Sequence, residues 1–129
     1  MKRLYAAAAI LLALGCGSAP QSVVTGAPGH RDVLFQAEIQ SSRVPGQSAY
    51  DLVAHLRPQY LRARGSNSFR DTTPLRAIVY IDGLKYGSVE QMKSLSADRV
   101  FQVRYLSAAD ATTRFGMDHG GGAILITTR

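Results

Sequence analysis

A lone cysteine, Cys16, closes a short apolar segment at the N-terminus, so the chain cannot form an internal disulfide. Basic residues 2–3 precede an apolar run over 4–14, and small residues lead into the cysteine. This arrangement is typical of an export signal, and the run is shorter than the roughly 20 residues that a membrane-spanning helix needs. A cysteine at this place predicts a bacterial lipoprotein in which Cys16 carries the lipid. We therefore expect packing alone to hold the fold together.

Two other interpretations of this segment stay open: an ordinary cleaved signal followed by an incidental cysteine, and an uncleaved N-terminal anchor. Under the lipoprotein interpretation, residues 1–15 are the signal peptide. Residues 16–31, rich in glycine, serine and proline, then form a flexible spacer. Residues 32–129 are long enough for one small domain with one core. This interpretation predicts a domain tethered by lipid to the cell envelope.

The first half of the expected domain combines a strand with a helix. Residues 33–39 predict a strand. Residues 48–57 predict a helix, because their apolar side chains recur at helical spacing. Ser48 and Asp51 have the spacing of an N-terminal cap, and Pro58 disfavours helical geometry at the residue before it.

From residue 74 onward the pattern alternates between strands and helices. Residues 77–81 are apolar on both faces and predict a covered central strand, whereas residues 101–105 alternate and predict a strand with one buried face. The other expected elements are a helix over 88–95 with a Ser88/Gln91 capping box, a helix over 107–115 that Gly116 stops, and a buried strand over 123–127. The predicted fold class is α/β (α+β): a small domain with a three- to four-stranded mixed sheet and two to three short helices.

Four motifs follow one another in this part of the chain. They are Tyr-Ile-Asp-Gly at 80–83, Val-Phe-Gln-Val at 100–103, an alanine-rich segment ending in Phe-Gly at 108–116, and a glycine-led segment ending in Thr-Thr at 121–128. Their order resembles the C-terminal half of the plug domain of TonB-dependent receptors, over residues 74–129. The segment 49–58 is also similar to lipoproteins that carry such a plug-like domain alone. The resemblance implies a plug-like fold, an outer-membrane setting, and an outer-membrane receptor or another envelope protein as partner.

In receptors of this family, the Thr-Thr strand leads into a transmembrane β-barrel. Each strand of such a barrel takes about 9–11 residues, whereas Arg129 directly follows Thr-Thr in this sequence. We therefore expect a stand-alone plug-like lipoprotein without the barrel. Attachment then comes from the lipid on Cys16, and transport through a pore does not carry over from the family.

Two loops are the candidate rims of a ligand or partner site. Asp82 and Tyr86 follow the first central strand, and Asp118 and His119 precede the last strand. Each loop also has a structural interpretation: Asp82 caps a turn, and Asp118 with His119 forms a surface pair beside a tight glycine turn. A phosphate loop is not indicated, because a strand and not a helix follows the glycines. The sequence has neither metal-ligand spacing nor a nucleophile motif, so we predict no catalytic residue, no metal and no cofactor.

The chain is basic, with a formal net charge of +6. One stretch holds five arginines: Arg57, Arg62, Arg64, Arg70 and Arg76. They indicate either contact with anionic headgroups or an acidic partner, or simply a solvated face. Nucleic acid is not an expected partner, because no stacking aromatic residues are interleaved with these arginines. Five tyrosines (Tyr50, Tyr60, Tyr80, Tyr86 and Tyr105) are expected to pack mostly in the core, with Tyr86 exposed.

These observations predict a membrane-anchored, plug-like lipoprotein that acts as a non-enzymatic binding module in the cell envelope. The alternative is a lipoprotein that captures a small ligand and passes it to a TonB-dependent uptake system. That alternative requires a concave, mostly apolar pocket with a few polar groups. A small hydrolase or metal enzyme is a third interpretation, and no group of residues in the sequence favours it.

Overall fold

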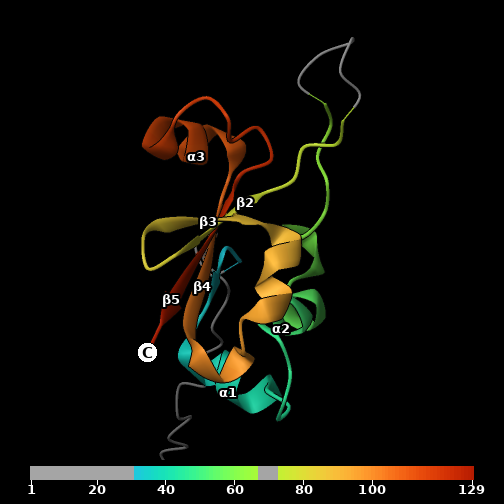
Figure 1. Cartoon of the computed structure of the whole chain (residues 1–129), viewed down its shortest axis with the longest axis vertical. Helices are drawn as coiled ribbons and strands as arrows, with labels where there is room; N and C mark the ends of the chain where they lie inside the picture. Colours follow the sequence, from blue (N-terminus) through green and yellow to red (C-terminus); the bar gives the residue numbers. More distant parts are fainter. Residues whose placement is uncertain (1–30, 67–72) are drawn as a thin grey trace, which may run out of the picture.

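The computed structural model describes residues 31–66 and 73–129 (Figure 1). The predictions for Cys16, for the signal peptide, for the spacer up to residue 30 and for Arg70 lie outside the described residues. The strands are β1 (Val33–Leu34), β2 (Ile78–Ile81), β3 (Leu84–Ser88), β4 (Val100–Leu106) and β5 (Ala123–Thr128). The α-helices are α1 (Gln36–Ser42), α2 (Ala49–Leu56) and α3 (Ala108–Phe115), and the 3₁₀ helices are η2 (Pro58–Tyr60), η3 (Val89–Ser94) and η4 (Ala97–Arg99).

The described strands form one mixed sheet in the order β1-β4-β5-β2-β3. The pair β2–β5 is parallel, and the other neighbouring pairs are antiparallel. The prediction of a small α+β domain with a mixed sheet is confirmed, with five strands where three to four were expected. The two edge strands are β1, which is shorter than the strand expected over 33–39, and β3, which was not expected.

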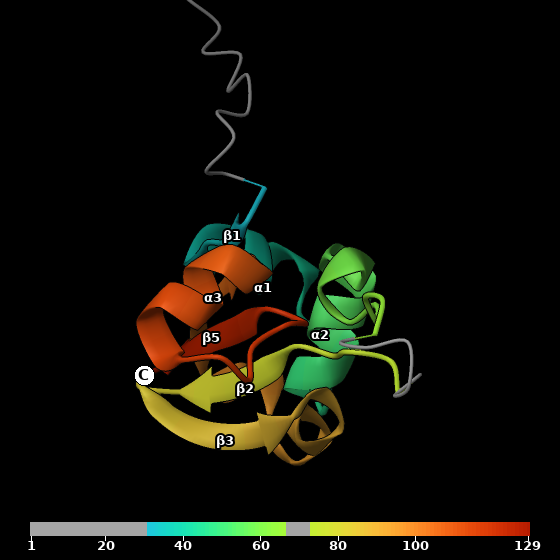
Figure 2. The ribbon, with the colours of Figure 1, turned by 90° about the horizontal axis from the view of Figure 1, so that it is seen from above.

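Helices cover the two faces of the sheet unequally. The side chains of α1, α2 and η3 join the larger hydrophobic core on one face, whereas α3 packs on the opposite face against part of β2 and β5. Figure 2 shows α2 and α3 on opposite sides of the strands. The face under α3 is therefore only partly covered, and the rest of it remains open to solvent.

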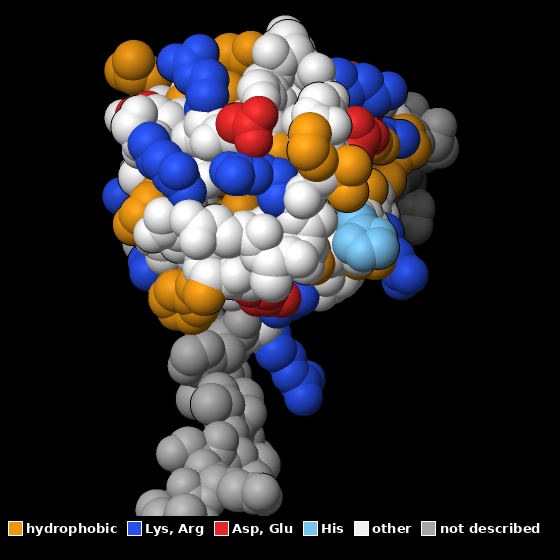
Figure 3. All heavy atoms as spheres, turned by 90° about the horizontal axis from the view of Figure 1, so that it is seen from below, with side chains coloured by type: hydrophobic (Ala, Val, Ile, Leu, Met, Phe, Trp, Pro, Cys, Tyr) orange, Lys and Arg blue, Asp and Glu red, His pale blue; other side chains and the backbone are white. Residues whose placement is uncertain are grey.

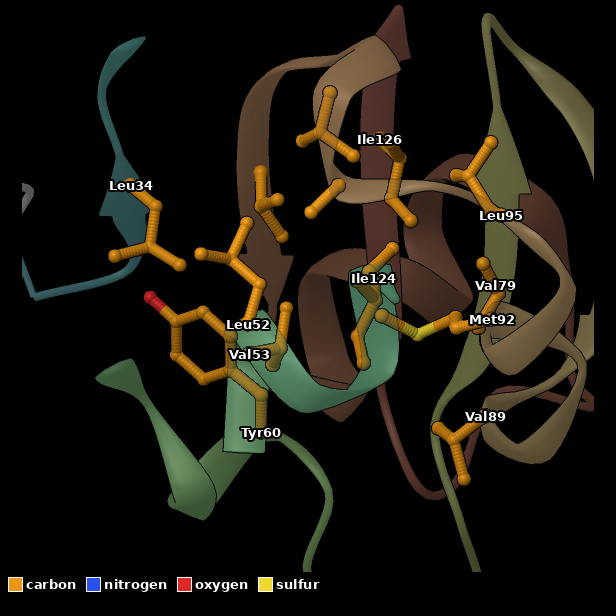
Figure 4. Close-up of a cluster of buried hydrophobic side chains, with 14 of the residues drawn as sticks. Leu34, Leu52, Val53, Tyr60, Val79, Val89, Met92, Leu95, Ile124 and Ile126 are labelled. Atoms are coloured by element: carbon orange, nitrogen blue, oxygen red, sulfur yellow. The ribbon is translucent and has the colours of Figure 1, made fainter. Parts of the chain in front are cut away.

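The larger core brings together side chains from nearly every element (Figure 4). Leu52 and Val53 of α2 point at the central strand β5, where Ile124 and Ile126 occupy alternate positions on the same face. Met92 of η3 fills the space between α2 and β2. This burial of apolar area is the main favourable term in folding, as expected for a domain without a disulfide.

The N-terminal strand prediction is wrong for most of its length. Only Val33 and Leu34 pair with β4, and α1 begins at Gln36. Ile39 is fully buried in the larger core. Residues 35–39 alternate in polarity as a strand would, but docking of one apolar helix side chain stabilises a helix here instead.

The prediction for α2 is confirmed at both ends. The Ser48 hydroxyl accepts a hydrogen bond from the Asp51 amide, and the Asp51 carboxylate accepts one from the Ser48 amide, which completes a capping box. Pro58 starts the 3₁₀ helix η2 after α2 has ended.

The strand β3 was not expected from the sequence, and it follows a tight turn at the end of β2. Asp82 and Gly83 both have positive φ, at 49° and 84°. This conformation gives a two-residue hairpin turn whose twist matches that of the flanking strands. The helix expected over 88–95 is 3₁₀ instead, and Ser88 makes no side-chain cap, so the Ser88/Gln91 capping box is wrong.

The alternation predicted for β4 fails at one residue. The register moves from Val100 opposite Thr128 to Gln102 opposite Thr127, so Phe101 is the extra residue of a bulge. Val100 is consequently buried, and Phe101 is 40% exposed. Val103 and Tyr105 face the core as the pattern predicts.

Tyr60 is buried in the core, and this burial makes stability sensitive to alkaline pH. Its hydroxyl donates to the Arg31 carbonyl at 2.5 Å, its ring stacks on Tyr105, and burial raises the pKa of Tyr60 to about 12. The tyrosine of the unfolded chain ionises near pH 10. The free energy that the protonated Tyr60 hydroxyl contributes to folding is therefore intact below pH 10 and is lost as the pH rises towards 12.

Between pH 8 and pH 11.5, we expect the free energy of unfolding of wild type to fall by about 2 kcal/mol more than that of Tyr60→Phe, which has no ionisable hydroxyl at this position. Urea unfolding at both pH values measures this difference, and equal losses would contradict it.

Candidate binding groove beside β3

A groove lies on the core side of the sheet, where β2 and β5 end and β3 begins. It has a volume of about 470 Å³. The lining residues are Ile81, Asp82, Leu84, Lys85, Tyr86, Ser94, Leu95, Arg99 and Thr128. They come from three strands, one turn and the segment containing η3 and η4. We call this feature the β3 groove.

The outer wall of the β3 groove is an edge strand that carries exposed apolar side chains. Among the described strands, β2 is the only neighbour of β3 in the sheet. Leu84 is 76% exposed and Tyr86 is 41% exposed. Tyr86 is the extra residue of a bulge, because Lys85 pairs with Tyr80 and Gly87 pairs with Val79. The Tyr86 hydroxyl lies 2.7 Å from the Ser94 hydroxyl, and this hydrogen bond fixes the aromatic ring over the groove.

Asp82 connects the hairpin turn to the end of β5. Its carboxylate accepts hydrogen bonds from the Thr128 hydroxyl at 2.6 Å and from the Thr128 amide at 2.9 Å. These two bonds hold the pKa of the Asp82 carboxyl below its usual value. Asp82 therefore remains an anion that positions the turn, and it is poorly suited to donate a proton. The structural interpretation of Asp82 as a turn residue agrees with this geometry.

The charged groups of the β3 groove have both signs. Arg99 is close enough to Asp82 to contribute to its lowered pKa, and Lys85 lies on β3 directly after Leu84. The groove thus combines apolar and polar side chains in one lining. Such a lining suits an amphipathic partner better than a purely apolar one.

The second candidate rim, Asp118 and His119, lies apart from the β3 groove. His119 is only 3% exposed, so the expectation of an exposed rim or surface pair is wrong for this residue. Its Nδ1 lies 2.9 Å from the Gly116 carbonyl, and its Nε2 lies 2.8 Å from the Tyr80 hydroxyl. The imidazole packs against the rings of Tyr80 and Phe115. It thereby joins the smaller core under α3, whose buried residues are Tyr80, Ala111 and Ala123. Asp118 itself is exposed.

Most of the described arginines of the basic stretch have partners within the fold. The contacts are the ion pairs Arg57–Glu38 at 2.8 Å and Arg76–Glu90 at 2.9 Å, and Arg64 at 5.0 Å from the Tyr105 ring centroid. Basic side chains are nevertheless spread over other parts of the surface. Figure 3 shows them across the end of the molecule that carries α1, with fewer acidic side chains between them. The stretch is therefore not a single basic patch.

The tyrosine predictions are confirmed. Tyr60, Tyr80 and Tyr105 are buried, Tyr50 is partly buried against the larger core, and Tyr86 is exposed. Over residues 31–66 and 73–129, no three or more histidine, cysteine, aspartate or glutamate side chains come together as a metal site would require. None of the helices in these ranges has the length and apolar character needed to cross a membrane.

Sequence reasoning named Asp82 and Tyr86 but missed Leu84, Lys85 and Arg99 of the β3 groove. Residues 84–86 alternate between apolar and polar side chains, but three residues are too few to indicate a strand, and Arg99 is placed by the tertiary fold. The available signal was the Asp82-Gly83 pair, because this dipeptide is a strong hairpin indicator when strands flank it.

No protein-family model matches the chain, and no curated protein matches it either. The resemblance to the plug domain of TonB-dependent receptors therefore stays a prediction from the sequence.

Proposed function

We propose that this chain is a lipid-anchored, non-enzymatic binding module of the cell envelope at the outer membrane, and that it binds an extended segment of an envelope protein along β3. The observation that supports this proposal is that the outer edge of β3 pairs with no other described strand and carries Leu84 and Tyr86 beside a groove. An edge strand offers free backbone donors and acceptors, and neighbouring pockets select the partner's alternate side chains.

The composition of the β3 groove favours binding over catalysis. Its lining includes one carboxylate, Asp82, and neither histidine nor cysteine. The Asp82 carboxylate accepts hydrogen bonds from both the hydroxyl and the amide of Thr128, and its lowered pKa makes it a weak base for activating that hydroxyl. Lipid attachment at Cys16 would hold this surface close to membrane proteins.

The attachment and the binding surface are tested separately. We expect Cys16→Ser to move the protein from the membrane fraction to the soluble fraction when the envelope is separated, because the acyl chains supply the anchor. Retention of Cys16→Ser in the membrane fraction, or a mass spectrum showing residue 16 without a lipid, would contradict the anchor.

Partner binding is tested with a photo-crosslinking residue in place of Lys85. This position lies on β3 and lines the groove, so the probe is next to a bound partner. We expect a discrete crosslinked envelope protein whose yield falls by about 30-fold in Leu84→Ser/Tyr86→Ser, because two apolar anchors are removed. Met117→Ser is the matched control, since Met117 is also apolar, is 88% exposed and lies outside the β3 groove. Equal crosslinking in both variants would contradict the proposal.

A second candidate function is capture of a small ligand that is passed to an uptake system. The volume of the β3 groove, about 470 Å³, falls within the range of small-molecule sites. This function requires the purified chain to bind a small envelope solute without any partner protein. Solute extracted with the purified protein, and lost in Leu84→Ser/Tyr86→Ser, would favour it over the protein-binding function.

A further inference from the structure

A small polar pocket lies on the opposite face of the sheet from the β3 groove, beside α3. It has a volume of about 170 Å³. Its lining residues are Gln102, Arg104, Arg114, Leu125 and Thr127, and we call it the arginine pocket. We propose that the arginine pocket binds the phosphate group of a ligand. This inference is independent of the function proposed for the β3 groove.

The fold gathers these residues from three elements. Gln102 and Arg104 occupy alternate positions of β4, so both face the same side of the sheet. Their cross-strand partners on β5 are Thr127 and Leu125, which present their side chains on that same face. Arg114 comes from the last turn of α3, the helix that covers the neighbouring part of this face.

The pocket brings together two positive charges, on Arg104 and Arg114, that form no ion pair with any described carboxylate. No carboxylate lines it. The ion pairs among the described residues use other arginines: Arg43 with Asp98, Arg57 with Glu38 and Arg76 with Glu90. Two guanidinium groups facing one small volume repel each other, and an anion between them would convert this repulsion into attraction.

The donor set suits phosphate in particular. A guanidinium offers a planar fork of donors that matches phosphate or carboxylate oxygens. Gln102 adds an amide and Thr127 adds a hydroxyl. A tetrahedral phosphate presents enough oxygens to use two forks and a hydroxyl together, whereas a carboxylate presents only two. The pocket is smaller than the roughly 300 Å³ of a whole-ligand site, so it fits a headgroup rather than an entire molecule.

The guanidinium of Arg114 is held in place before any ligand binds. It lies 5.3 Å from the ring centroid of Phe115, and Phe115 in turn stacks on Tyr80 at a centroid distance of 4.1 Å. A cation over an aromatic face is stabilised there. Because the side chain is already positioned, Arg114 loses less conformational entropy when a ligand binds.

The first test is titration of the full chain carrying Cys16→Ser with inorganic phosphate, followed by NMR. We expect saturable shifts at the Thr127 amide and the Arg104 and Arg114 side chains, with a dissociation constant of about 1 mM. Arg104→Gln/Arg114→Gln should weaken binding by at least 10-fold. The control Arg62→Gln/Arg129→Gln removes the same charge from exposed residues outside the pocket, and it should bind as the parent chain does.

The second arm identifies the source of the phosphate by co-sedimentation with vesicles of phosphatidic acid, whose headgroup is a phosphate monoester, or of phosphatidylcholine, whose phosphate is a diester. Preference for phosphatidic acid that is lost only in Arg104→Gln/Arg114→Gln assigns a lipid headgroup. Saturation by phosphate without that preference assigns a soluble phosphate ester. Absence of saturable phosphate binding, or equal binding by the two double variants, would overturn the inference.

Discussion

Replacing Gly121 with alanine is expected to destabilise the domain by about 3 kcal/mol or more. A Cβ at this position would overlap the backbone carbon and oxygen of Arg76. Backbone atoms cannot move aside as a flexible side chain can, so the parallel pairing of β2 with β5 has to shift. The Tyr105 hydroxyl also donates to the Gly121 carbonyl at 3.1 Å, and a shift would strain that bond. Urea unfolding followed by circular dichroism measures the loss.

The control for Gly121→Ala is Gly46→Ala. Gly46 has a positive φ of 80°, and no atom lies within 4 Å of the place that a Cβ would take. Alanine there costs backbone strain of about 1 kcal/mol but causes no clash. The predicted clash with the Arg76 backbone is contradicted if Gly121→Ala lowers the free energy of unfolding no more than Gly46→Ala does.

Replacing His119 with alanine is expected to cost about 3 kcal/mol, because it removes a buried ring and two hydrogen bonds together. The Gly116 carbonyl can only accept, so the His119 Nδ1–H donates to it. Nε2 then accepts from the Tyr80 hydroxyl. Alanine would leave that hydroxyl without its partner beneath α3 and open a cavity beside Phe115. Thermal or urea unfolding gives the change in free energy.

Tyr80→Phe separates the hydrogen bond from the ring contacts. It keeps the stacking on Phe115 and removes only the hydroxyl, so we expect a loss of about 1–2 kcal/mol. A surface histidine would tolerate alanine within about 0.5 kcal/mol. A result in that range for His119→Ala would contradict the buried position of this side chain.

The elements that the sequence predicted well are those with strong local signals. Ser48 with Asp51 at the start of α2, and Gly116 at the end of α3, are caps whose geometry depends on neighbours within a few residues. The apolar runs of β2 and β5 are buried on both faces, so they are recognisable without knowledge of the rest of the fold.

The candidate site was only half predictable. Asp82 and Tyr86 lie together in the β3 groove, because a tight turn keeps residues close in sequence close in space. His119 lies instead in the smaller core, because contacts with Tyr80 and Phe115 bury it. Nothing adjacent to His119 in the sequence indicates these contacts. The same holds for the arginine pocket, whose members come from β4, α3 and β5.

The sequence by itself determined which segments form α2, α3, β2 and β5, since caps, glycine stops and apolar periodicity act over a few neighbouring residues. The tertiary structure alone decided that residues 36–42 form a helix, that β3 adds an edge strand, and which side chains face the two pockets. These outcomes depend on contacts between residues that are far apart in the chain. Their free energy comes from burial and pairing in the assembled sheet, which no local pattern encodes.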